Sequence, residues 1–163
     1  MDFNKLWANF MDTVQNHYMD FNGRIPRAQF WYYILVVVGI NLVATIVDSV
    51  ATGGLLRAIV GLGLLLPTAG MAARRMQDTG QNGQLVWIWV IVAAFYALLG
   101  LLLAASAFGA VAFLTFFGFF FVIGGLLGIV YVIATIIIIY FCAQPGQTEA
   151  NAYGPVPPVW TPN

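Results

Sequence analysis

The most informative stretch of the chain, residues 85–142, reads LVWIWVIVAAFYALLGLLLAASAFGAVAFLTFFGFFFVIGGLLGIVYVIATIIIIYFC. No Asp, Glu, Lys or Arg occurs anywhere between Thr79 and Thr148. The hydrocarbon core of a membrane holds no water to satisfy backbone polar groups, so such a stretch has to cross it as hydrogen-bonded helices of about 20 residues each. The sequence therefore predicts an all-α fold, a polytopic membrane helical bundle.

Composition supports one membrane domain and argues against several kinds of site. The chain has 163 residues, of which 61% are hydrophobic and 7% charged, with a mean hydropathy of +0.89; an average soluble domain has about 25% charged residues. Cys142 and His17 are the only cysteine and histidine, which excludes an internal disulfide, a thiolate metal cage and a multi-histidine centre. No catalytic, phosphate-binding or nucleic-acid motif occurs. We therefore expect no enzymatic activity, catalytic residue, cofactor, metal or nucleic-acid partner.

Residues 1–21 precede the first apolar run and have their own pattern. Their apolar residues recur in steps of three and four, which is typical of one face of an amphipathic helix: Phe3, Leu6, Trp7, Phe10, Met11, Val14, Tyr18 and Phe21. We expect this helix to lie in the membrane interface or to pack on the bundle. The alternative is a helix that binds a partner protein.

Four transmembrane helices are predicted after this segment, at about residues 28–50, 55–73, 85–106 and 119–142. The apolar residues from 107 to 142 would exceed about 50 Å as a single helix, whereas the membrane core is about 30 Å thick. We therefore expect a short hairpin near residues 108–118, with a re-entrant segment or a helix extension over 107–118 as alternatives. Residues 144–163 are rich in Pro and Gly and are predicted to form an extended tail.

The distribution of positive charge predicts the orientation. Five of the six basic residues form two clusters, namely Lys5 with Arg24 and Arg27, and Arg74 with Arg75. The positive-inside rule assigns both clusters to the cytoplasm and leaves Arg57 outside. With an even number of spans, we expect both termini to be cytoplasmic and the protein to lie in a plasma membrane.

The clustered arginines form one candidate site at the cytoplasmic face. Guanidinium groups bind phosphate and carboxylate oxygens in a forked geometry, which suits an anionic lipid headgroup. The alternative is that they set the topology and pair with Asp20, Asp78 or Glu149; Asp78 follows Arg74 by four residues, a pairing distance on a helix. We expect a charge-paired cluster with the 151–155 segment folded against it. Its members would be Arg24, Arg27, Arg74, Arg75, Asp78, Asn151 and Tyr153.

A second candidate site lies within the membrane. Asn41 and Asp48 are two helical turns apart and share a face of the first span. Polar side chains at this depth line a cavity or pair with protein groups. In the first case, Asn41 and Asp48 would serve transport. In the second, they would be structural, with Asn41 bonded to a neighbouring helix and Asp48 paired with Arg57. In the last span, Gly124 and Gly128 would permit close helix packing, either within the chain or in a homo-oligomer.

Three polar segments carry a resemblance to a known family. They read FNGRIPRAQFW at residues 21–31, RRMQDTG at 74–80 and NAYGP at 151–155. Their order and spacing, from about Tyr18 to Pro157, resemble the bacterial inner-membrane family known as domain of unknown function 805. The chain departs from the family pattern at Gln29, where an acidic residue is frequent, at Gln77, where histidine is usual, and at Gln84-Leu85, which replaces an aromatic pair. The resemblance implies a small multi-pass protein of the bacterial inner membrane and brings no established activity.

These patterns favour a non-enzymatic scaffold or sensor that binds membrane lipids, through anionic headgroups, or a protein partner at its cytoplasmic face. The alternative is a small transporter or channel subunit that uses Asn41 and Asp48.

Overall fold

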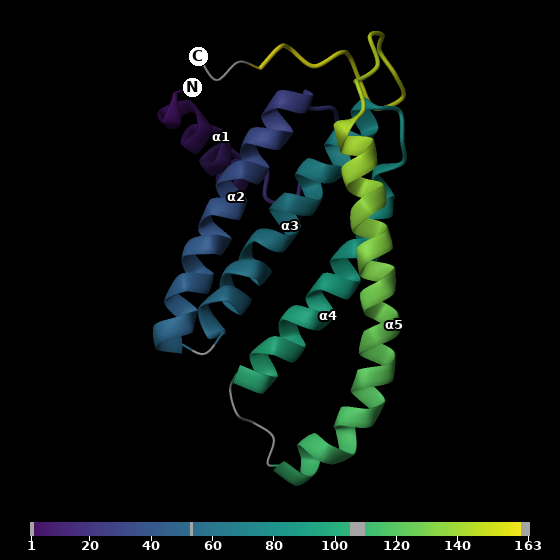
Figure 1. Cartoon of the computed structure of the whole chain (residues 1–163). Coiled ribbons are helices and arrows are strands. Elements are labelled where there is room, and N and C mark those ends of the chain that lie inside the picture. The colour runs from purple at the N-terminus through teal and green to yellow at the C-terminus, as the bar shows by residue number, and fades with distance from the viewer. Residues whose placement is uncertain (1, 53, 105–109, 161–163) are drawn as a thin grey trace.

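The computed structural model describes residues 2–52, 54–104 and 110–160, and within these ranges the fold is helical, without strands (Figure 1). The long helices are α1 (Phe3–Asn16), α2 (Arg27–Val47), α3 (Leu55–Asp78), α4 (Val86–Ala104) and α5 (Ala110–Ala143). A π-helical turn, η1 (Asp48–Thr52), extends α2, and a 3-10 turn, η2 (Gly83–Leu85), leads into α4. The predicted all-α fold class is confirmed for these residues.

Three helical segments are long and apolar enough to cross a membrane: Arg27–Val50, Leu55–Asp78 and Phe121–Ala143. The segment Gly83–Leu99 of η2 and α4 is apolar but shorter. Large aliphatic side chains lie exposed along α2, α4 and α5, among them Leu42, Ile91 and Ile136. Such a surface is unfavourable in water and suits contact with lipid.

The first helix is shorter than predicted and buries a partly polar face. It ends at Asn16 rather than near residue 21, and its buried residues are Leu6, Asn9, Phe10 and Thr13. Asn9 and Gln29 of α2 exchange two hydrogen bonds of 3.1 Å, from Asn9 Nδ2 to the Gln29 carbonyl and from Gln29 Nε2 to Asn9 Oδ1. Because these polar groups are paired, α1 can lie across α2 and α3, as Figure 1 shows.

The central helix α3 contacts each of the other α-helices and runs further than predicted. The prediction ended this span at Ala73, but the helix continues to Asp78. Its residues from Ala69 to Asp78 are all buried. Tertiary packing therefore stabilises the helical conformation of this end, although its polar composition does not predict a helix. The extension places Arg74, Arg75 and Asp78 on successive turns of one rigid element.

The last helix, α5, has 34 residues, which corresponds to about 50 Å. Residues 110–118 are helical, so the helix-extension alternative describes them and the expected hairpin does not; residues 105–109 lie outside the described residues. A helix satisfies the backbone hydrogen bonds of an apolar segment internally, which a hairpin cannot do. Figure 1 shows that α5 bends near its N-terminal end, toward the end of α4.

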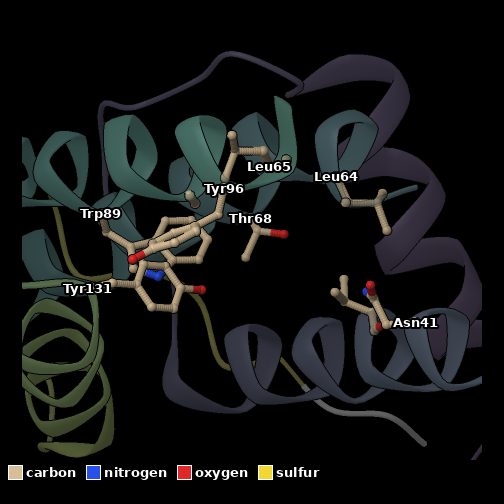
Figure 2. A pocket seen from close by; sticks show the side chains of 11 residues that line it. Asn41, Leu64, Leu65, Thr68, Trp89, Tyr96 and Tyr131 are labelled. Carbon is tan, nitrogen blue, oxygen red and sulfur yellow. The ribbon is translucent and has the colours of Figure 1, made fainter. Parts of the chain in front are cut away.

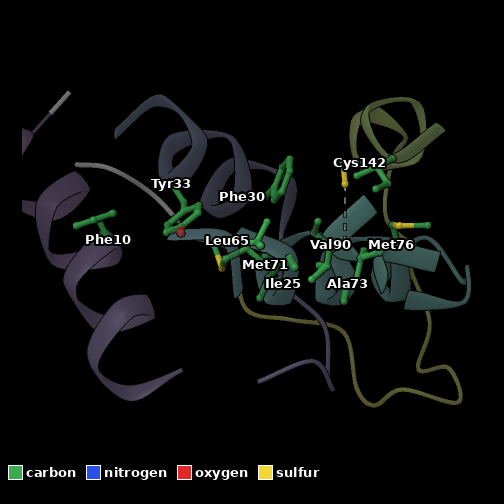
Figure 3. Close-up of a cluster of buried hydrophobic side chains, with 14 residues drawn as sticks. Phe10, Ile25, Phe30, Tyr33, Leu65, Met71, Ala73, Met76, Val90 and Cys142 are labelled. Atoms are coloured by element: carbon green, nitrogen blue, oxygen red, sulfur yellow. Dashed lines mark hydrogen bonds between the residues drawn. The ribbon is translucent and has the colours of Figure 1, made fainter. Parts of the chain in front are cut away.

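The packed core lies at the end of the bundle where α2 begins and where α3 and α5 end. Figure 3 shows side chains from α1, α2, α3, α4 and α5 meeting there, including Tyr33, Met71, Met76 and Cys142, all fully buried. The C-terminal tail passes over the same end of the bundle (Figure 1). This core fixes the relative positions of the polar groups described next.

Candidate functional site

Asp78, at the C-terminal end of α3, lies between two arginines. Its Oδ1 accepts a hydrogen bond of 2.9 Å from Arg24 Nε, and its Oδ2 accepts one from Arg75 Nη1. The side chains of Arg24 and Arg75 are 1% exposed and that of Asp78 is 4% exposed. The helical pair is therefore Arg75 with Asp78, three residues apart, and not the predicted pair of Arg74 with Asp78. We call Arg24, Arg75 and Asp78 the clasp.

The remaining guanidinium donors of the clasp bind backbone carbonyls of the tail. Arg24 donates to the carbonyl oxygens of Gln147, Glu149 and Gly154 at 2.7, 2.8 and 3.2 Å. Arg75 donates to the carbonyl of Cys142 at 3.1 Å and to that of Gln144. One carboxylate and several backbone carbonyls therefore compensate the two buried cations. Without such partners, burying a guanidinium group would be very unfavourable.

The backbone closes tightly around the carboxylate. The Gln147 amide donates to the Asp78 carbonyl at 2.9 Å. A Cβ atom at Gly146 would lie only 2.1 Å from Asp78 Oδ2, so no larger residue fits there without a shift of the chain. The turn before Arg24 also needs glycine, because Gly23 has a φ of 105°. Glycines on both sides thus bring the tail and the Arg24 loop onto Asp78.

The predicted residues Asn151 and Tyr153 belong to this arrangement. Asn151 Nδ2 donates to the Gln77 carbonyl at 2.9 Å, and Asn151 Oδ1 accepts from the Tyr153 amide at 2.9 Å. Asn151 and Gly154 pair as an isolated antiparallel bridge. Instead of extending away from the membrane domain, the tail folds into a turn against the end of α3.

Arg74 and Arg27 lie outside the clasp. Arg74 is buried, with Nη1 3.6 Å from Asp20 Oδ2 and Nη2 3.3 Å from Met71 Sδ, and its Nε has no partner among the described residues. Arg27 is exposed at the start of α2 and donates one long bond of 3.4 Å to the Ala143 carbonyl. Among the four predicted arginines, Arg27 therefore has the guanidinium most available to an external anion.

The two polar residues predicted within the membrane are not brought together. The Asp48 carboxylate accepts hydrogen bonds from the backbone amides of Leu56 and Arg57, at 3.0 and 2.8 Å, and so caps the start of α3. Asn41 Nδ2 donates to the carbonyl of Val37 in its own helix at 2.9 Å. Asn41 also lines a cavity of about 430 Å³, and Asp48 does not.

This interhelical cavity lies between α2, α3, α4 and α5. Its wall is mostly apolar, with the rings of Trp89, Tyr96 and Tyr131 gathered on one side, Asn41 on the other and Thr68 between them (Figure 2). Tyr96 also contacts both glycines of α5: its hydroxyl donates to the Gly124 carbonyl, and a Cβ at Gly128 would lie 3.1 Å from the Tyr96 hydroxyl oxygen, whereas a Cβ at Gly124 would have nothing within 4 Å. Both glycines thus contact α4 within the chain, and a homo-oligomer through them stays a prediction.

A second cavity of about 430 Å³ lies beside the clasp and was not predicted. We call it the amide crevice, because four carboxamide side chains line it together with aromatic rings and one glycine: Phe21, Asn22, Gln77, Asn82, Gly83, Gln84, Trp87 and Tyr153. Gln77 is buried, and its Nε2 donates to the Phe21 carbonyl at 2.8 Å. The departures from the family pattern at Gln77 and Gln84 are a sequence signal that could have indicated it.

Comparison with known proteins gives a family and two relatives. The chain is 29% identical over 89 residues to proteins named "Uncharacterized protein YiiR" from Escherichia coli K12 and from Escherichia coli O157:H7. These matches cover 54% of this chain and 60% of each relative. No solved structure matches the chain. The family described as protein of unknown function DUF805 matches residues 18–155, which include the clasp, both cavities and the tail turn, and the chain therefore belongs to this family.

Proposed function

We propose that the protein is a multi-pass protein of the bacterial inner membrane with four spans, in which α4 is the third, and with both termini cytoplasmic. Support comes from the three long apolar helices, the apolar residues of α4 and the clustering of basic residues at one end of the bundle. Parallel fusions of green fluorescent protein and alkaline phosphatase to the C-terminus test this topology. Strong phosphatase activity would mean an external tail and would contradict it.

At its cytoplasmic face, the protein acts as a non-enzymatic scaffold or sensor that binds anionic lipid headgroups or a protein partner. The observation that carries this proposal is the clasp, because it holds the tail in a fixed conformation over the helix ends. The buried guanidinium groups of Arg24 and Arg75 are occupied by internal acceptors, so their role is to shape this face. Arg27, which is exposed next to it, supplies the contact with an anionic headgroup.

Native mass spectrometry with lipid analysis tests this role. Wild-type protein should retain anionic lipid selectively over zwitterionic lipid, and Arg27→Ala should lose most of that selectivity. Arg57→Ala is the matched control, because Arg57 lies near the opposite end of α3 from the clasp. Equal loss in both variants, or no selectivity in the wild type, would contradict the proposed headgroup contact.

The interhelical cavity favours a second candidate function, a small transporter or channel subunit. Of the two polar residues predicted within the membrane, Asn41 lines this cavity and Asp48 caps α3 instead. Asn41→Cys in a Cys142→Ser background tests whether water reaches the cavity. Rapid labelling by a membrane-impermeant thiol reagent would support this candidate, and complete protection would argue for a dry cavity and against transport.

A further inference from the structure

The amide crevice combines features that single it out from the rest of the surface. It lies where the loop after α1, the end of α3, η2 with the start of α4, and the tail turn meet. Gln77 belongs to its lining and is 4% exposed, and Gln77 Oε1 has no hydrogen-bond partner among the residues that the structure describes. A buried carbonyl oxygen without a donor is unfavourable, so a hydrogen-bond donor that enters the crevice and reaches Gln77 would gain a favourable contact there.

The lining also limits the charge of any ligand. Its polar side chains are the carboxamides of Asn22, Gln77, Asn82 and Gln84 and the phenol of Tyr153, and no carboxylate, ammonium, guanidinium or imidazole group belongs to the lining. The nearby charges of the clasp are paired with each other and do not belong to the lining. A charged ligand would lose hydration without gaining an ion partner. The crevice therefore suits a neutral ligand.

Carboxamides both donate and accept hydrogen bonds, and so do hydroxyl groups, whereas a phosphate ester oxygen only accepts. A ligand with several hydroxyls can satisfy Gln77 Oε1 as a donor and can also accept from neighbouring amide nitrogens. Trp87 adds a flat apolar surface, because it is 40% exposed, and its ring centroid lies 4.8 Å from that of Phe21 in a tilted arrangement. An aromatic face next to directional polar groups is suited to the C–H face of a sugar or cyclic polyol.

We propose that the amide crevice binds a neutral polyhydroxylated group, a sugar or polyol, which is presented either as the headgroup of a lipid or as a free solute. The cavity volume of about 430 Å³ falls within the ~300–1,000 Å³ of small-molecule sites. The inference rests on the proposed placement of this face at the cytoplasmic boundary of the membrane. It does not depend on the Arg27 contact, so the Arg27→Ala experiment and the one below can fail separately.

The test uses full-length protein purified in a detergent without a sugar headgroup, because maltoside or glucoside detergents would compete. In one arm, nanodiscs of phosphatidylcholine doped with monoglucosyl diacylglycerol are compared with undoped nanodiscs by native mass spectrometry. In the other arm, myo-inositol or glucose is titrated in solution and followed by saturation-transfer NMR. Retention of the glycolipid alone identifies a lipid headgroup, and binding of the free polyol identifies a soluble ligand; either result supports the inference.

Variants at exposed lining positions keep the test decisive, since they do not disturb the core. Gln84→Ala and Trp87→Ala should each weaken binding about tenfold. Gln81→Ala and Ile88→Ala are matched controls, because they lie next to the crevice in sequence but do not line it, and they should bind as the wild type does. The inference is overturned if neither probe binds, or if binding survives both lining variants unchanged.

Discussion

The clasp and the two cavities differ in how completely their polar groups are paired. In the clasp, each nitrogen of the two guanidinium groups has an internal acceptor, and the shared carboxylate is almost fully buried. Among the residues that the structure describes, the Asn41 side chain in the interhelical cavity donates to its own helix, and Gln77 Oε1 in the amide crevice has no hydrogen-bond partner. The charged residues of the clasp thus account for structure, whereas the uncharged amides, together with the exposed Arg27, remain for a ligand.

The largest effect is expected at the centre of the clasp. Asp78→Ala would leave the buried Arg24 and Arg75 without their counter-ion, and breaking a buried ion pair in this way costs about 3–5 kcal/mol. We expect a large drop in the melting temperature of the protein in detergent, measured by fluorescence-detected size-exclusion chromatography. Asp12→Ala, at an exposed position, should have little effect. Equal stability of the two variants would contradict the view that the clasp, unlike the cavities, stabilises the fold.

A second, smaller effect is expected at Gly146. Gly146→Ala would add a Cβ atom 2.1 Å from the Asp78 carboxylate, so the tail has to shift, at a cost of about 1–3 kcal/mol. Gly39→Ala is the control, since nothing lies within 4 Å of its added Cβ. The unfolding midpoint in urea should fall for the first variant only. A stable Gly146→Ala protein would show that the tail does not pack closely on Asp78.

The smallest effect is expected at the cavity residue Asn41. Asn41→Leu removes one bond to the Val37 carbonyl within the same helix, and membrane hydrogen bonds contribute only about 0.6 kcal/mol on average. We therefore expect thermal stability to change by less than about 1 kcal/mol. A destabilisation as large as that of Asp78→Ala would mean that Asn41 is structural and would contradict its assignment to the cavity.

The helices were predictable wherever the apolar pattern alone decides them. The predicted spans at 28–50, 55–73 and 119–142 agree with the apolar helical segments to within a few residues, except at the end of α3, and the helix α5 itself begins at Ala110 rather than near residue 119. There the sequence shows only two arginines followed by turn residues, and burial against α1, the Arg24 loop and the tail extends the helix. A pattern of hydrophobicity cannot reveal tertiary burial of a charged turn.

The candidate site was predictable in part of its geometry but not in its pairing. The structure brings Arg24, Asp78, Asn151 and the Tyr153 amide together, as expected for polar residues of distant segments that share one face, whereas the predicted members Arg27 and Arg74 lie outside the clasp. Which of Arg74 and Arg75 meets Asp78 depends on a rotation of about 100° around the helix. The tail carbonyls bound by Arg24 carry no sequence signal, since every residue has one. The cavities arise from gaps in packing, which no local pattern encodes.

The central claim is that the clasp holds the tail against the membrane domain, and hydrogen–deuterium exchange of the tail amides tests it most directly. The Gln147 amide donates to the Asp78 carbonyl, and the tail turn depends on carbonyl contacts with Arg24. In the wild type, peptides covering residues 144–154 should be protected. Arg24→Lys keeps the charge but loses the forked donors, so it should speed exchange there by about tenfold or more, with α4 unchanged. Rapid exchange of the wild-type tail, or equal protection in Arg24→Lys, would contradict the account.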